Sequence, residues 1–458
     1  MSHSPSHSFV SDFTFGSVPK KMLVFAAPLF CSNLLQVVYN MVDMVVVGHV
    51  EGKIGLSAVS VGGDVSNFLT YLAMGFSSAG QVIISQYIGA GQREKIGRFV
   101  GTMFAFLFSF AVGMSAVCLT LRRPILGLMN TPAQAYDQSL AYATVCMVGL
   151  LFIYGYNTIS AVLRGLGDSK HPFLFISVAA AANVILDLLF VLRFGMGAMG
   201  AALATVISQG FSFLCCAVFL WHRREQFGFS LTRQDFLHTE RGMLISLLQL
   251  GIPMAIKNAS IQFSKLFVNA WINSYGVEVS AMAGIANKLS SITNLISNSV
   301  NTAGSSMVGQ NIGARKYNRV PRIMVTAFCI TMCSSLLLTA GVLLFPRQVF
   351  GIFTDEAEVL AIAMEYVPVA ILLFLSSACR APMNALINGS GDYRVNFATA
   401  ILDGLVMRIG LALLFGLGLH MQYMGFWLGD ALAGFTPFGI GLVYYFSGNW
   451  KKQHLLRE

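Results

Sequence analysis

An acidic residue lies in the middle of an apolar stretch near the start of the chain. The stretch VVYNMVDMVVVGHV (37–50) contains Asp43, with Tyr39 four residues and Asn40 three residues before it. Residues three or four apart share a face of an α-helix, and Gln36, seven residues before the acid, extends the same polar stripe. A helix formed here would therefore present a carboxyl group next to phenol and amide groups.

A second stretch, NVILD (183–187), repeats this arrangement, with Asp187 four residues after Asn183. Two carboxyl groups with amide and phenol partners can share a proton or coordinate Na⁺ through oxygen ligands. Desolvation and mutual repulsion of the two acids favour the binding of a proton or cation. The alternative is that each acid only hydrogen-bonds to a neighbouring helix or lies at an interface with water.

The amino-acid composition indicates what kind of environment surrounds these acids. The chain has 458 residues, of which 55% are hydrophobic and 11% charged, and its mean hydropathy is +0.69. Soluble domains are typically about 25% charged, so the sequence predicts a polytopic membrane protein. Because a spanning helix needs about 20 apolar residues, we expect twelve spans. They are 22–47, 56–88, 97–121, 136–163, 171–192, 196–221, 243–273, 279–309, 321–345, 357–387, 395–418 and 421–447.

The basic residues predict which side of the membrane each loop faces. Nineteen Lys and Arg residues fall in the terminal segments and the loops on their side, against five in the opposite loops. The positive-inside rule therefore places both termini in the cytoplasm, and it explains the basic composition without a nucleic-acid partner. The predicted divisions are a flexible tail (1–20), a first lobe (21–221), a linker (222–242), a second lobe (243–448) and a final tail (449–458).

The two halves of the chain are copies of each other. Q-x-I-G-A recurs around Gln86 and Gln310, and G-x-G-D recurs around Asp168 and Asp392, with the same offset in both pairs. Repeated matches at a near-constant offset indicate duplication. Six spans in each half give parallel repeats, an architecture that suits alternating access.

The repeated G-x-G-D stretch could be mistaken for a nucleotide-binding loop. However, no strand precedes it and the rest of the phosphate-binding pattern is missing. We predict a tight turn in which the glycines adopt the required φ and the aspartate caps the following helix.

The second half carries basic residues where the first carries acids. Lys257 and Lys265 lie two turns apart within one apolar segment, and Arg380 and Arg408 lie in two others. These side chains can pair internally with Asp403 or with backbone carbonyls, and Lys257 can extend to the cytoplasmic surface. The alternative is that this lobe attracts an anionic group of a substrate.

With these features in place, the chain resembles the multidrug and toxic compound extrusion (MATE) transporters over nearly its whole length. The resemblance rests on YNMVD (39–43), LRGLGDSKHPF (163–173), NVILD (183–187), GAALAT (200–205) and the duplicated loops. It implies an all-α, V-shaped bundle of twelve transmembrane helices in two pseudo-symmetric six-helix lobes. It also implies export of organic compounds in exchange for H⁺ or Na⁺.

The resemblance assigns the cation site to the first lobe. The family's coupling acids and amide match Asp43, Asn183 and Asp187, which could hold Na⁺. Tyr39 matches an aromatic residue one turn before the first acid, and Thr205 matches a hydroxyl ligand.

The second lobe departs from part of the family. The NorM-type branch is proposed to use acids on helices 7 and 10, whereas those helices here carry Lys257, Lys265 and Arg380. We therefore expect coupling in the first lobe, as proposed for the DinF-type branch. Substrate-cleft candidates are Gln36, Asn40, Asn157, Lys265 and Arg380.

These observations predict a cation-coupled antiporter for amphiphilic organic compounds or drugs. The alternative within the same fold is a specific exporter or flippase for a lipid-linked or anionic metabolite. We expect no enzymatic activity, no cofactor other than the coupling ion, and a monomer in the inner (plasma) membrane. Its partners are a small organic substrate and the lipid bilayer. The duplicated lobes and the scarcity of pore-like charge rings disfavour a channel.

Overall fold

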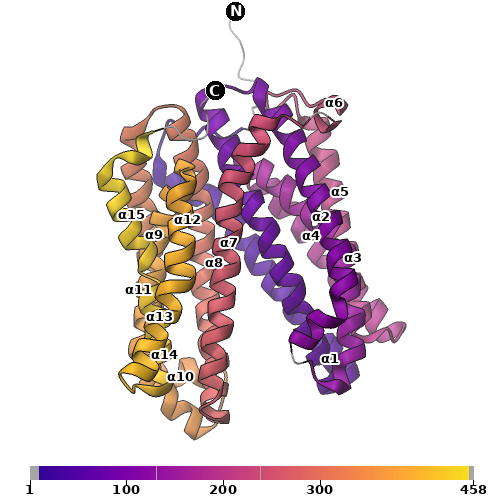
Figure 1. Ribbon diagram of the computed structural model, residues 1–458, viewed down its shortest axis with the longest axis vertical. Helices are drawn as coiled ribbons and strands as arrows, with labels where there is room; N and C mark the ends of the chain where they lie inside the picture. Colours follow the sequence, from indigo (N-terminus) through magenta and orange to yellow (C-terminus); the bar gives the residue numbers. More distant parts are fainter. Residues whose placement is uncertain (1–9, 130, 238, 453–458) are drawn as a thin grey trace, which may run out of the picture. The chain divides into compact units, whose positions relative to one another are not determined.

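The computed structural model describes residues 10–129, 131–237 and 239–452, and within these ranges every regular element is a helix (Figure 1). Ten helices of this described part are long and apolar enough to cross a membrane. One of them, α1 (Val18–Ala90), is interrupted at Gly52 (φ +62°, ψ −146°) and so supplies two spans. The less apolar α8 (Val277–Gly313) supplies the twelfth. The predicted all-α fold of twelve transmembrane helices in two six-helix lobes is confirmed.

The helices of the first half follow the predicted spans closely. After α1 they are α2 (Glu94–Leu128), η1 (Ala133–Ala135), α3 (Tyr136–Gly165), α4 (Lys170–Asp187), η2 (Leu188–Arg193) and α5 (Gly197–Arg223). The element η2 is π-helical and continues α4 directly after its last residue.

The helices of the second half contain two further π-helical segments, η4 and η5. In chain order the elements are α7 (Arg241–Asn273), α8, η3 (Tyr317–Arg319), α9 (Val320–Leu344), α10 (Pro346–Gly351), α11 (Ala357–Ser390), α12 (Tyr393–Ile401), η4 (Leu402–Met407), α13 (Arg408–Leu413), η5 (Leu414–Gly418), α14 (Gln422–Ala433), α15 (Thr436–Ser447) and η6 (Asn449–Lys451).

The chain divides into two compact units, and the division cuts across two helices. The first unit is built mainly from 27–251 and the second from 12–26 together with 252–452. Residues 18–26 of α1 therefore belong to the second unit, whereas residues 241–251 of α7 belong to the first. We call these the first and second units below.

The start of the chain differs from the flexible tail predicted for residues 1–20. Residues 1–9 lie outside the described part, but Phe13 is buried in the second unit. Its backbone N–H donates to Gln310 Oε1 at 2.8 Å, and its carbonyl accepts from Asn311 Nδ2 at 3.2 Å. The repeated Q-x-I-G-A segment of the second unit thus holds this part of the chain in place.

The described residues of the linker predicted at 222–242 pack against a helix. It contains the short α6 (Arg233–Leu237), which packs on α2. A Cβ atom at Gly97 would lie 1.8 Å from the carbonyl oxygen of Ser230, and one at Gly101 would lie 2.1 Å from a carbonyl oxygen of α6. Only glycine permits so close an approach of α2 to the linker backbone.

The duplication seen in the sequence recurs in the packing of each unit. A Cβ atom at Gly165 would lie 2.9 Å from Cβ of Ile84, and one at Gly389 would lie 2.8 Å from Cβ of Val308. Gly389 follows Gly165, and Val308 follows Ile84, by the same number of residues that separates the repeated loop motifs. The same close helix contact is therefore present in both copies.

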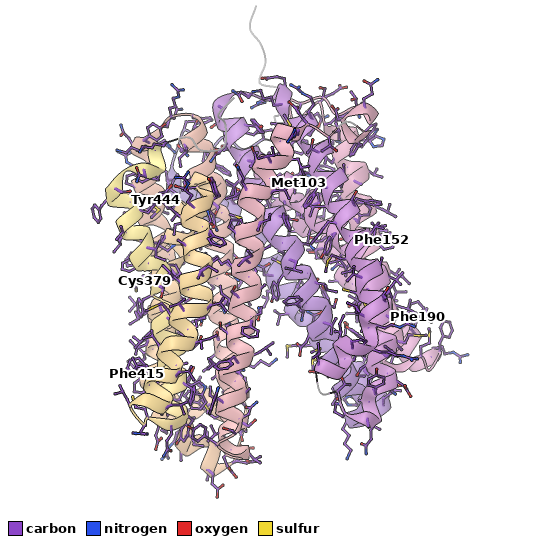
Figure 2. The ribbon with its side chains drawn as sticks, in the orientation of Figure 1. Met103, Phe152, Phe190, Cys379, Phe415 and Tyr444 are labelled. Carbon is purple, nitrogen blue, oxygen red and sulfur yellow. The ribbon has the colours of Figure 1, made fainter. Side chains whose placement is uncertain are left out.

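The two G-x-G-D stretches form the predicted turns. Gly167 (φ +85°) and Gly391 (φ +72°) adopt the left-handed backbone that favours glycine. Asp168 and Asp392 accept hydrogen bonds from the backbone N–H groups two and three residues on, at 3.0 to 3.4 Å. Tyr444, labelled in Figure 2, donates to Asp392 Oδ2 at 3.2 Å. The predicted capping role of both aspartates is confirmed.

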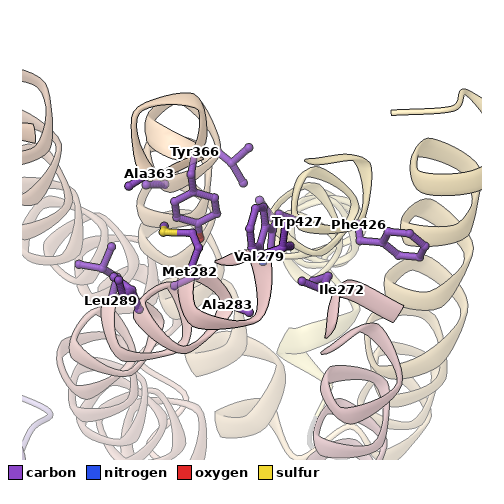
Figure 3. Packing of buried hydrophobic residues seen from close by; sticks show 14 of the residues in the cluster. Ile272, Val279, Met282, Ala283, Leu289, Ala363, Tyr366, Phe426 and Trp427 are labelled. Atoms are coloured by element: carbon purple, nitrogen blue, oxygen red, sulfur yellow. The ribbon is translucent and has the colours of Figure 1, made fainter. Parts of the chain in front are cut away.

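Apolar side chains cover the outside of the helices as well as the interior. Val443 and Phe446, for example, are largely exposed, as expected for helices surrounded by lipid. Inside the second unit, Ile272, Tyr366 and Trp427 belong to one buried cluster contributed by α7, α8, α11 and α14 (Figure 3). This cluster fixes the helices on which the basic residues of the second unit lie.

Candidate functional site

Three helices of the first unit bring the predicted cation-site residues together. Asp43 lies on α1, Asp187 ends α4 and Thr205 lies on α5. Both acids are buried, with 2% of Asp43 and 0% of Asp187 exposed. Thr205 Oγ1 donates a hydrogen bond to Asp43 Oδ2 at 3.2 Å. The acid on α1 is therefore held by a hydroxyl group from a distant part of the chain.

The Asn183 amide links the same acid to α5. With Nδ2 directed at the acid, Asn183 donates to Asp43 Oδ1 at 3.0 Å and accepts from the Thr205 backbone N–H at 3.3 Å. The opposite orientation leaves the amide oxygen facing only acceptors, so the first orientation is the favourable one. Each oxygen of the Asp43 carboxylate then receives one donor.

Asp187 has a different environment. Neither of its carboxylate oxygens receives a hydrogen bond from an N–H or O–H group in the described part of the chain, although both are buried. The carboxyl group of Asp43 is close enough to share a proton with it. An ionised carboxylate without donor or counterion is strongly disfavoured in an apolar interior. The arrangement therefore suits a proton or a small cation held between the two acids.

The predicted aromatic residue belongs to the same cluster through a partner that sequence reasoning missed. Tyr39, one turn before Asp43, is buried, and its hydroxyl accepts a hydrogen bond from Gln209 Nε2 at 3.3 Å. Gln209 lies one turn after Thr205 on α5. Its spacing of four residues from a predicted ligand was a signal that could have identified it.

An apolar layer lies next to the acids. Val47, Val191, Ala201, Tyr142 and Cys146 form part of one buried cluster. Val47 and Val191 each follow one of the two acids by four residues, which is about one helical turn. The layer lies between the two acids and the interruption of α1 at Gly52. It therefore limits the access of water to the acids from that side.

A carboxylate also fixes the start of α5. Glu51, at the end of the first span of α1, accepts a hydrogen bond from the Ala198 N–H at 3.2 Å through Oε2. The first backbone N–H groups of a helix lack partners within that helix, and an anion there is stabilised by the helix dipole. This contact holds α5 against α1, and thereby helps to place Thr205 beside Asp43.

The five substrate-cleft candidates are distributed over both units. Gln36 and Asn157 are half-buried and Asn40 is exposed in the first unit, where Asn157 Nδ2 donates to the backbone of its own helix at 2.8 Å. Lys265 and Arg380 line one cavity of the second unit. The structure brings these two together, and a single cleft lined by all five stays a prediction.

Among Lys257, Lys265, Arg380 and Arg408, Arg408 is the residue that pairs with Asp403. Arg408 donates through Nη2 to Asp403 Oδ1 at 3.2 Å and through Nη1 to Asp430 Oδ1 at 2.5 Å. Lys257 Nζ donates instead to Asn384 Oδ1 at 2.6 Å. Asp430 was not identified from the sequence, although it lies within the predicted span 421–447 and the signal that marks Asp43, an acid in an apolar segment, could have identified it.

The chain is similar to known proteins in sequence and in fold. The family model described as MatE matches residues 28–189 and again 253–414. The second match begins and ends at one constant offset from the first, as expected for two copies of one unit. Together the two matches cover more than half of the chain.

Two relatives from Bacillus subtilis are the probable multidrug resistance proteins YpnP and YoeA. Each is 28% identical to this chain, over 98% and 96% of it and over 99% and 96% of their own lengths. Among solved structures, a MOP superfamily transporter from Pyrococcus furiosus, described as having a binding pocket of reverse polarity, has a TM-score of 0.88 at 22% identity, covering 97% of this chain and 99% of its own. A MATE structure in a straight conformation has a TM-score of 0.87 at 22% identity, covering 98% of this chain and 99% of its own.

Proposed function

Because the chain belongs to the MatE family of multidrug efflux transporters, we propose that it is a secondary active exporter that exchanges amphiphilic organic compounds for H⁺ or Na⁺. Exchange proceeds by alternating access between the two repeats. The coupling cation binds in the first unit at Asp43, Asn183 and Asp187, with Thr205 and Tyr39 as supporting residues.

The observation that supports this proposal is the pairing of two buried acids. Asp187 has two buried oxygens that receive no donor from the described residues, and it faces Asp43, whose oxygens do receive donors. Such a pair cannot hold two negative charges without a compensating proton or cation. A structural role would be expected to give both acids neutral or cationic partners.

Coupling follows if the loaded and empty forms of this site favour different conformations. With a proton or Na⁺ bound, the two acids are stable in their buried state. Without it, their repulsion favours a conformation in which water reaches them. A substrate that binds the hydrated conformation more tightly shifts the same equilibrium, and the two binding events are then linked.

Transport by the purified protein in liposomes tests the proposal. A pH gradient and a Na⁺ gradient are imposed separately, and transport of a fluorescent organic compound is followed. Asp43→Asn and Asp187→Asn are each expected to reduce gradient-driven transport at least tenfold, because either change removes one of the two paired charges. Asp64→Asn is the matched control, since Asp64 is an exposed acid on the same helix.

The proposal fails if Asp43→Asn transports at the wild-type rate under both gradients. The gradient that drives transport by the wild-type protein but not by the two variants identifies the coupling ion. No cofactor beyond that ion is proposed. We further propose a monomer in the plasma membrane with both termini in the cytoplasm.

A second class of substrate is favoured by a specific observation in the second unit. Lys265 and Arg380 line a polar cavity there, which suits a lipid-linked or anionic metabolite better than a cationic drug. Liposome transport of an anionic dye against a cationic dye of similar size separates these two substrate classes.

A further inference from the structure

The second unit contains a counterpart of the cation site in which the residue types have changed. At the offset between the two family-model matches, Arg408 corresponds to Asn183 and Asp430 corresponds to Thr205. In the first unit, Asn183 and Thr205 hold Asp43 through neutral hydrogen-bond donors. In the second unit the same two positions form an ion pair at 2.5 Å.

The acids of this counterpart are already neutralised within the cluster. Arg408 is 2% exposed and bonds both Asp403 at 3.2 Å and Asp430 at 2.5 Å. One guanidinium group thus contacts two carboxylates in a fork-like geometry suited to arginine. Lys257 donates to the neutral amide of Asn384, so it adds a further charge to the cluster without an ion pair.

Two further cations line the same space without forming an ion pair. Lys265 forms no hydrogen bond or ion pair with any of the described residues. Arg380 donates through Nη2 to the neutral Asn294 side chain and makes no ion pair in the described ranges. With Lys257 and Arg408 against Asp403 and Asp430, the cluster has a formal surplus of two positive charges. Lys257 is buried, and Lys265 and Arg380 are half-buried. Charges withdrawn from water are normally paired, so the surplus favours the binding of an anion.

The space beside these cations has a polar part and an apolar part. One cavity is lined by Lys265, Arg380 and Arg408 together with hydroxyl and amide groups, among them Thr293 and Ser377. A second cavity shares Lys265, Ser290, Leu373 and Asp430 with the first, and its other lining residues include Ile272, Tyr366 and Trp427. A polar lining that suits an ionic group therefore adjoins an apolar lining that suits an aromatic or aliphatic group.

We propose that these adjoining cavities form a binding site for an amphiphilic organic anion, with its carboxylate, phosphate or sulfonate group between Lys265 and Arg380. The apolar portion of the ligand packs against Trp427 and Tyr366. This inference rests on the proposed export function for its biological role, because it names the charge of the exported compound. In this chain the first copy of the duplicated site holds a cation and the second copy holds an anion.

Direct binding to the purified full-length protein in phosphatidylcholine nanodiscs tests the site. Fluorescein and rhodamine 6G share a xanthene ring system but carry opposite charges, and fluorescence anisotropy reports their binding. We expect the Kd for fluorescein to rise at least tenfold in Lys265→Gln and in Arg380→Gln, with the Kd for rhodamine 6G unchanged. Lys265→Arg, which keeps the charge, should retain binding.

Lys288→Gln is the matched control, because Lys288 is an exposed lysine on α8 of the same unit. The inference is overturned if the wild-type protein does not bind fluorescein, or if the double variant Lys265→Gln/Arg380→Gln binds it as tightly as wild type. Competition with benzoate and with dihexanoyl phosphatidylglycerol then distinguishes a free organic anion from a lipid phosphate, and displacement by either supports the site.

Failure of this inference can be distinguished from failure of the proposed function. Asp43→Asn should lose transport yet still bind fluorescein, and adding Lys265→Gln to that variant should weaken the binding as it does in wild type. If Asp43→Asn transports normally while Lys265→Gln abolishes fluorescein binding, the cation-coupling proposal fails and the anion site stands.

Discussion

The Thr205 hydroxyl is a neutral donor to a buried acid, so its removal tests the cation site without changing its charge. We predict that Thr205→Val slows gradient-driven transport roughly tenfold, because a hydrogen bond to a charged group contributes about 1.5–3 kcal/mol. Thr205→Ser keeps the donor that bonds Asp43 and should retain most of the rate. Initial transport rates in liposomes measure both variants, and equal losses in the two would contradict the role of the hydroxyl.

Arg408 is a single cation that neutralises two acids. We predict that Arg408→Met destabilises the protein by about 3 kcal/mol, because removing one partner leaves buried charges uncompensated. Thermal unfolding in detergent should show a clearly lower midpoint. Adding Asp403→Asn should recover part of the loss, since Asp403 is one of the two acids bonded by Arg408. Lys288→Met, an exposed site in the same unit, should have little effect.

At the residue scale, part of the cation site was predictable. Asp43 and Asp187 stand out because carboxyl groups are rare in apolar segments, and Asn183 lies one turn from the second of them. Gln209 was missed because a glutamine on a mixed helix face has no such contrast with its surroundings. Which cation pairs with Asp403 did not follow from the sequence, because the choice depends on helix rotation, which spacing alone does not give.

At the element scale, glycines on α2 determine how the linker packs. We predict that Gly97→Val displaces the linker, because a Cβ atom there would lie 1.8 Å from the carbonyl oxygen of Ser230. Limited trypsin digestion should cleave after Arg223 or Arg224 several times faster than in wild type. Gly113→Val is the control on the same helix, since no atom lies within 4 Å of its added Cβ. Equal cleavage of both variants would show that the linker does not depend on this contact.

Helix existence and length followed well from apolar runs, because the bilayer fixes the length of a span. The π-helical segments did not follow. The element η2 begins immediately after Asp187, and η4 contains Asp403. Such segments change the rotation of the residues beyond them and often occur at functional sites. They arise from packing between helices that are distant in the sequence, so a short stretch of sequence does not reveal them.

At the scale of the whole molecule, the distribution of basic residues predicts its orientation. Alkaline phosphatase fused after residue 452 should be inactive and green fluorescent protein fused there should fluoresce, because the end of the chain is expected in the cytoplasm. Phosphatase inserted between residues 193 and 197, in the loop before α5, should be active. The opposite pattern at both positions would reverse the predicted topology.

The duplication was the most reliable global prediction, because loop sequences preserve an offset that also appears in the packing of Gly165 and Gly389. The assignment of residues 12–26 to the second unit was not predictable. It depends on two side-chain amides that bond to the backbone N–H and carbonyl of Phe13. Every residue has these backbone groups, so the residue types in 12–26 do not reveal the contact.

The division of the chain has a consequence for how the molecule arose. Residues 12–26 belong to the second unit and residues up to 251 to the first. At the offset between the two family-model matches, the segment that corresponds to 12–26 is 237–251. Each copy has therefore given the beginning of its own first helix to the other copy. This is the pattern of a domain-swapped homodimer whose two chains have been joined into one. A chain with only one of the two copies would lack the segment that completes its own unit and would need a second chain to supply it.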